Sequence, residues 1–99
     1  MNKDLELLSS QTLIEYAKKL ESQYVVSIDG QDIGIKIYVD SNGYYQMDTS
    51  HYYQGPGRAG VYITSAANFD SAEEALIIAR NQLSLAYDNK GQWVKNINY

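Results

Sequence analysis

The stretch Ile33–Asp40 reads IGIKIYVD and alternates strictly between aliphatic residues and small, polar or aromatic ones. Successive side chains of a β-strand point to opposite faces, so this pattern predicts a strand with one buried face and one face in water. Tyr38 belongs to the second set, and we expect its ring on the exposed face.

Strand and turn signals on both sides of this stretch extend it into a sheet. The apolar run at residues 24–28 precedes it across Asp29-Gly30, which is a strong hairpin signal. After it, Ser41-Asn42-Gly43 predicts a turn into a third strand that runs from Tyr44 to about Tyr53.

A second turn is predicted at Gly55-Pro56-Gly57, where proline sets φ at the first central position and glycine allows a positive φ at the second. A fourth strand is expected at Val61–Ser65. Because consecutive strands with short connections usually lie side by side, the four strands predict an antiparallel meander.

One helix is predicted before the strands in the sequence, and a second helix is predicted after them. Residues 4–22 carry an amphipathic stripe, with an alternative start near residue 10 where Thr12 and Glu15 match a capping box. Residues 71–88 carry an alanine-rich stripe behind Asp70 as N-cap, with Glu73 completing a capping box.

The end of the chain completes the predicted layout. Gly91 is the expected C-terminal cap of the second helix, and the apolar tail at residues 92–99 should pack back onto the domain, with an added strand as one possibility. The prediction is a single α+β domain over residues 1–99: helix, four-stranded antiparallel meander, helix and tail, with both helices on one sheet face.

Composition excludes several classes of protein. The 99 residues suit one domain, and the net charge of −4 does not favour generic attraction to nucleic acid or to an anionic membrane. The absence of cysteine excludes disulfides, thiolate metal sites and cysteine nucleophiles. No apolar run resembles a signal peptide or a membrane span, so we expect a cytoplasmic protein.

The glycine-rich stretch Gly55–Gly60 reads GPGRAG and matches the G-x-G-x-x-G pattern. In a dinucleotide-binding fold that pattern must open a helix, whereas here it leads into a predicted strand. A turn is therefore the better interpretation. Arg58 at its tip lies near His51 in the sequence.

An enzyme or small-ligand site around His51, Asp48 and Arg58 is one hypothesis, and it rests on proximity alone. His51 is the only histidine, and without cysteines it forms no ordinary zinc site. An Asp48 side chain three residues away on a strand would point to the opposite face. We therefore expect no enzyme, no metal and no cofactor.

The order of helix, strands and helix resembles the layout of the double-stranded RNA-binding domain. Such modules place basic residues at the N-terminus of the second helix to meet phosphates. This chain has Asp70, Glu73 and Glu74 there. Nucleic-acid binding is therefore kept only as the alternative function, with tyrosines as stacking platforms.

The stretch Phe69–Leu83, which begins FDSAEEAL, resembles capped helices in small antitoxin and immunity proteins. Ten tyrosines against one phenylalanine are the other unusual feature. Tyrosine favours strands and is enriched in binding surfaces. We predict a small acidic protein-binding inhibitor or adaptor, of the immunity-protein or phage anti-defence (anti-CRISPR) type, whose partner is another protein. The expected partner-binding residues are Tyr38, Tyr44, Tyr52, Tyr62, Arg58 and His51.

Two further expectations concern side-chain direction. In each of the pairs Tyr44-Tyr45 and Tyr52-Tyr53, one ring must point in and one out. Ile78 and Leu85 lie on the side of the second helix away from its alanine stripe. We expect these side chains to contact the first helix, the tail or, in a homodimer, a second copy of the chain.

Overall fold

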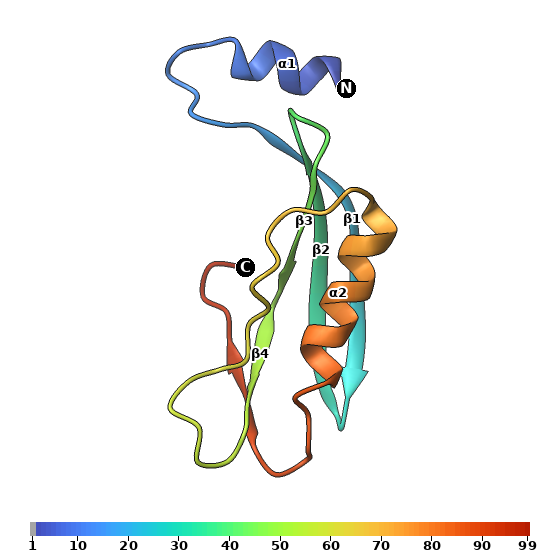
Figure 1. Ribbon diagram of the computed structural model, residues 1–99, viewed down its shortest axis with the longest axis vertical. Coiled ribbons are helices and arrows are strands. Elements are labelled where there is room, and N and C mark those ends of the chain that lie inside the picture. The colour runs from blue at the N-terminus through green and yellow to red at the C-terminus, as the bar shows by residue number, and fades with distance from the viewer. Residues whose placement is uncertain (1) are drawn as a thin grey trace.

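The computed structural model describes residues 2–99 and shows an α+β fold with two helices and two small antiparallel sheets (Figure 1). The larger sheet has the order β1-β2-β3, and the smaller one pairs β4 with β5. The elements in chain order are α1 (Lys3–Ser9), β1 (Lys18–Ile28), β2 (Gln31–Asp40), β3 (Tyr45–Thr49), β4 (His51–Gln54), α2 (Ala72–Ser84) and β5 (Gln92–Lys95).

The hairpin of β1 and β2 is the centre of the fold and confirms the prediction from the alternating stretch. Asp29 and Gly30 both have positive φ, 52° and 81°, as the mirror-image turn of a two-residue hairpin requires. Ile33, Ile35 and Ile37 are buried, whereas the residues between them are only partly buried.

The N-terminal helix predicted over residues 4–22 is wrong for most of that length. The helix α1 ends at Ser9, where the Ser9 hydroxyl donates to the Leu5 carbonyl at 2.6 Å, and β1 already begins at Lys18. Side chains of the predicted apolar stripe stay in solvent, with Leu13 87% and Tyr16 70% exposed. The physical reason is that pairing with the long strand β2 satisfies the backbone of residues 18–28, whereas the helical stripe has no surface to cover.

The predicted third strand is divided at Ser50, and its two halves belong to different sheets. The Ser50 hydroxyl accepts from the Gly34 N–H at 2.7 Å, and the Ser50 N–H donates to the Gly34 carbonyl at 2.9 Å. The Ser50 carbonyl accepts from the Asn96 N–H at 2.8 Å, on the side of the C-terminal tail. At this residue the strand therefore changes partners from β2 to β5.

The predicted fourth strand, Val61–Ser65, is an irregular segment, so the four-stranded meander is wrong. Its backbone is satisfied by other groups: the Tyr62 N–H donates to the Tyr53 carbonyl at 2.8 Å, and the Thr64 N–H donates to the Gln82 side chain at 2.9 Å. Gln82 is buried and in turn donates to the Thr49 hydroxyl at 3.2 Å. The Gln82 side chain of α2 thus supplies a hydrogen-bond acceptor that a neighbouring strand would otherwise provide.

The helix α2 is shorter than predicted and is capped one residue later. Ser71, not Asp70, is the N-cap, and its hydroxyl accepts from the Glu74 N–H at 3.0 Å. Glu74 replaces Glu73 as the returning carboxylate and accepts from the Asp70 N–H at 3.2 Å. The helix ends at Ser84, so Gly91 is not its cap; the tail that follows Gly91 forms β5.

The core lies between α2 and strands β2 and β3. Ala75 and Ala79 are fully buried, and these small residues let the helix approach the isoleucines of β2. Of the helices in residues 2–99, only α2 covers this sheet face. The helix α1 lies beyond the turn between β2 and β3, at one end of a molecule that extends 47 Å by 25 Å by 20 Å (Figure 1). The prediction that both helices share one face is therefore wrong, because α1 is too short and too distant to reach it.

Candidate functional site

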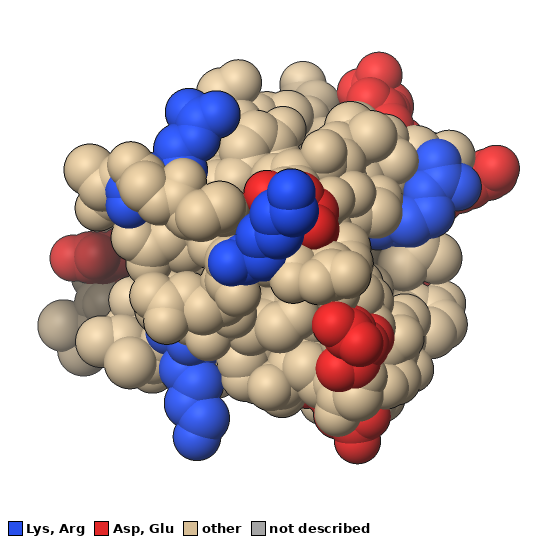
Figure 2. Space-filling model, turned by 90° about the horizontal axis from the view of Figure 1, so that it is seen from below, with Lys and Arg blue, Asp and Glu red and all other residues tan. Residues whose placement is uncertain are grey.

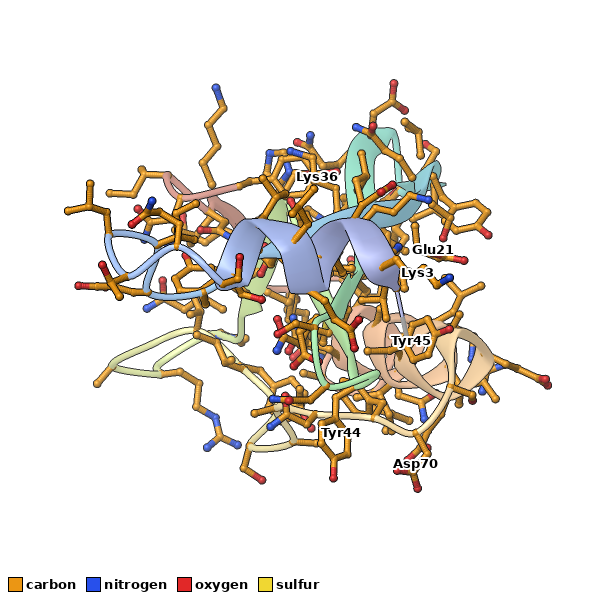
Figure 3. All side chains as sticks on the ribbon, turned by 90° about the horizontal axis from the view of Figure 1, so that it is seen from above. Lys3, Glu21, Lys36, Tyr44, Tyr45 and Asp70 are labelled. Atoms are coloured by element: carbon orange, nitrogen blue, oxygen red, sulfur yellow. The ribbon has the colours of Figure 1, made fainter. Side chains whose placement is uncertain are left out.

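The face of the three-stranded sheet opposite α2 is called the open face here. On β2 it carries Lys36 and Tyr38, which alternate with the buried isoleucines. On β3 it carries Gln46, which pairs with Tyr38, and Asp48, which pairs with Lys36. Figure 3 shows Lys36 on the side of the sheet away from α2.

The C-terminal residue Tyr99 lies on the open face. A Cβ atom at Gly34 would clash with the Tyr99 hydroxyl, so the missing side chain of this glycine makes room for the ring. The Lys36 ammonium group lies 4.0 Å from the centroid of the Tyr99 ring, which is a cation–π contact. A terminal aromatic side chain is thereby held over the middle of β2.

Three tyrosines lie near enough to Asp48 to be affected by its charge, and we call Tyr38, Tyr52 and Tyr99 the tyrosine cluster. Burial raises the pKa of each of these phenols, and the nearby Asp48 carboxylate raises it further in all three. The three hydroxyl groups therefore stay protonated at neutral pH. The Tyr99 hydroxyl is buried against Gly34 without a hydrogen-bond partner, so the cluster presents aromatic area, the hydroxyls of Tyr38 and Tyr52 and one carboxylate on a face that α2 does not cover.

The other residues predicted to bind a partner lie outside the cluster. Tyr44, which follows the turn after β2, is 47% exposed, and Tyr62 in the segment after β4 is 42% exposed. His51 is half-buried beside Ser50, whose hydroxyl lies 2.8 Å from the His51 Nδ1 atom. Arg58 is exposed at the tip of its turn.

The tyrosine pairs divide as expected, and the structure shows which ring is inside. Tyr45 packs against the core while Tyr44 points into solvent; Figure 3 shows the two rings in different directions. Tyr53 is 1% exposed, whereas Tyr52 is half-buried and belongs to the tyrosine cluster.

A hollow of about 660 Å³ lies between the glycine-rich turn and the segment after α2, with Arg58, Tyr62, Leu85 and Asp88 in its lining. The Asp88 carboxylate is already engaged, because it accepts from the Tyr53 hydroxyl and from the Lys90 N–H at 3.0 Å. These two hydrogen bonds lower the pKa of Asp88. We assign Asp88 to the fold, where it holds the segment after α2 against β4.

Tyr53 joins this anchor to an aromatic cluster. Its ring centroid lies 5.1 Å from those of both Tyr87 and Trp93.

The turn at Gly55–Gly57 has the predicted form, with φ of 73° at Gly57 and a hydrogen bond of 3.2 Å from the Arg58 N–H to the Gly55 carbonyl.

The three residues of the enzyme hypothesis, His51, Asp48 and Arg58, lie in different parts of the structure. Arg58 lines the hollow, which contains neither His51 nor Asp48, whereas Asp48 lies on β3 opposite Lys36, near the tyrosine cluster. Within residues 2–99, no group of three or more histidine, aspartate or glutamate side chains is placed to hold a metal ion. The same residues contain no helix of the length and apolar character needed to cross a membrane.

The two residues predicted for self-association differ in their surroundings. Ile78 is partly buried and packs against the core cluster. Leu85 follows the end of α2 and is 74% exposed at the hollow. Ile78 thus already has a partner within the chain, and only Leu85 offers a large free surface.

Charge is scattered on the end of the molecule drawn in Figure 2. Lysine and arginine side chains stand apart from one another there and are separated by uncharged atoms. This end therefore offers no continuous basic surface for a phosphate backbone.

No protein-family model, no curated protein and no solved structure matches this chain. The sequence predicted Tyr38 and Tyr52 as binding residues, but it did not predict that Tyr99, Lys36 and Asp48 lie on the same face. Parity along β3 places Asp48 opposite the core face and could have identified it. No local pattern indicates that the last residue of the chain returns to β2.

Proposed function

We propose that this chain is a protein-binding inhibitor or adaptor, of the immunity-protein or phage anti-defence type, and that the tyrosine cluster is the centre of its binding surface. The observation that carries the proposal is the placement of Tyr38, Asp48 and the Tyr99 ring on one face of the larger sheet, with Tyr52 nearby, where no helix of residues 2–99 covers them.

The chemistry of the cluster suits a protein partner. Tyrosine brings a large rigid ring and a hydroxyl at low entropic cost, and it is enriched among the residues that dominate binding energy. The Asp48 carboxylate, on the same face as the tyrosines, is complementary to an arginine or lysine side chain, which can pair with the carboxylate and stack on a ring. We therefore propose a partner that presents a basic side chain. Tyr44, Tyr62, Arg58 and His51 remain proposed contacts outside the cluster.

Replacing Tyr52 or Tyr38 by alanine should weaken partner binding about tenfold or more, while the melting temperature falls by less than about 5 °C. The measurement is quantitative co-purification with tagged protein from the native host, followed by the dissociation constant with the purified partner. Tyr52→Phe keeps the ring and should retain part of the affinity. Comparing it with Tyr52→Ala distinguishes the contribution of the ring to binding from that of the hydroxyl.

The matched control is Tyr16→Ala, because Tyr16 is 70% exposed and lies outside the sheets. It should bind like the unchanged protein. Equal binding by Tyr52→Ala, Tyr38→Ala and Tyr16→Ala would contradict the proposal. A fall in melting temperature well above 5 °C for the cluster variants would instead assign those rings to packing.

Nucleic-acid binding, with the tyrosines as stacking platforms, is the alternative function, and the lysines of the open face are the cations that could support it. Lys18 lies 4.2 Å from the centroid of the Tyr38 ring, so both cations near the cluster already contact tyrosines. We expect labelled single- and double-stranded oligonucleotides not to bind below about 100 μM at about 50 mM salt, since non-specific binders usually exceed that affinity. Binding that weakens with added salt would favour the alternative and count against a protein partner.

A further inference from the structure

The strand β1 leaves one whole edge of the larger sheet unpaired. Among residues 2–99 its only sheet neighbour is β2. The segment from Ser22 to Ile28 contains no charged residue and no proline, the usual devices that protect an edge. Val25 is 70% exposed and Tyr24 is 43% exposed, so an uncharged strand edge with apolar side chains is open to solvent.

The backbone of Val25 points outward from this edge. Val25 lies directly opposite Gly34 in the pairing of β1 with β2. The N–H and carbonyl of Gly34 are both bonded to Ser50, on the side away from β1. In an antiparallel pair, residues opposite each other both exchange hydrogen bonds or both turn away. The N–H and carbonyl of Val25 therefore face solvent, and by the two-residue alternation so do those of Gln23 and Ser27.

We propose that two copies of this chain associate edge to edge through β1, antiparallel, with the two-fold axis at Tyr24. Each Val25 would then exchange both backbone hydrogen bonds with Gln23 of the second copy. The two Tyr24 rings would face each other as a cross-strand aromatic pair. The product is one continuous six-stranded sheet, in the ordinary size range for sheets.

Side-chain pairing distinguishes this register from its neighbour at Val25. Moving the axis one residue, to Val25, keeps the backbone directions compatible but places Tyr24 opposite Val26 of the second copy, so the pair of tyrosine rings is lost. The stretch from Ser22 to Val26, which pairs with itself when the axis lies at Tyr24, follows the bulge between Leu20 and Ser22 and contains no charged residue, so no like charges meet within it.

This association is independent of the proposed function, because it uses the strand edge and leaves the tyrosine cluster on the open face. It also differs from a homodimer through α2, where Ile78 packs against the core. A protein could therefore form the dimer and fail to capture a partner, or the reverse, and the two proposals can fail separately.

The first test is the mass of the protein in solution by size-exclusion chromatography with light scattering over a range of concentrations. We expect a concentration-dependent species of twice the monomer mass. Val25→Lys should shift it to monomer, because a charge then lies in the paired strand. Ile97→Lys makes the same exchange at a side chain that is 92% exposed outside β1, and it should leave the dimer unchanged. A monomer at all concentrations, or a dimer that survives Val25→Lys, would overturn the proposal.

The second test fixes the register by a single cysteine, since the chain contains none. Opposed residues that turn their backbones away bring their Cα atoms to about 4.5 Å, within reach of a disulfide. Tyr24→Cys should therefore cross-link to a covalent dimer under mild oxidation, and Tyr16→Cys, at an exposed position outside the strand, should do so far more slowly. Equal rates for the two variants would show random collision and overturn the axis at Tyr24.

Discussion

Ile37→Ala should lower the free energy of unfolding by about 2–5 kcal/mol, the range for removing a large aliphatic side chain from a packed core. Ile37 is 0% exposed and belongs to the cluster of β2 isoleucines under α2. In a small domain a loss of this size is a large fraction of the total stability, so the melting temperature should fall by more than about 10 °C.

The control for this change is Ile97→Ala, the same truncation at a side chain that is 92% exposed. It should alter the free energy of unfolding by no more than about 0.5 kcal/mol. Denaturant unfolding followed by circular dichroism measures both values. Similar losses for the two variants would mean that α2 does not cover β2 as described.

Gly91→Ala should destabilise the protein by about 2–3 kcal/mol or more, because the added methyl group has no space. A Cβ atom there would clash with the Gln54 carbonyl and would also meet the Tyr53 hydroxyl at 2.8 Å. The Gly91 N–H donates to that hydroxyl at 2.6 Å, so β5 cannot retreat without losing the contact. We expect loss of the β4–β5 pairing and a change in the fluorescence of Trp93, which stands on β5.

Gly60→Ala is the matched control, since nothing lies within 4 Å of a Cβ atom at that position. This variant should be as stable as the unchanged protein or slightly more so, because alanine reduces the freedom of the unfolded chain. If Gly91→Ala unfolds like Gly60→Ala, the tight approach of β5 to β4 is incorrect.

Features that depend on neighbouring residues were predicted well. The alternation at Ile33–Asp40 specifies a half-buried strand whichever element covers it, because side-chain direction follows from the strand backbone alone. Asp29-Gly30 and Pro56-Gly57 specify their turns because few residues adopt a positive φ without cost. The inside and outside members of the tyrosine pairs follow the same parity rule.

Features that depend on competition between distant segments were not predicted. Residues 18–22 lie within a segment that has a helical stripe, but β2 offers them a ladder of backbone hydrogen bonds, and the strand prevails. Ser50 reads as the middle of a strand, yet Gly34 on one side and Asn96 on the other divide it. Val61–Ser65 has strand composition, but Gln82 and Tyr53 supply its hydrogen-bond partners instead.

The same division applies to the candidate site. Alternation along the sequence by itself determined that Tyr38 faces away from the core, because that depends only on position within one strand. Only the tertiary structure decided that Tyr52 and Tyr99 come near Tyr38 and Asp48, because the division at Ser50 and the return of the tail over Gly34 bring three separate segments together. The alternation along a strand determines the face on which a side chain lies. The residues that become its neighbours depend on which segments of the chain pair with that strand.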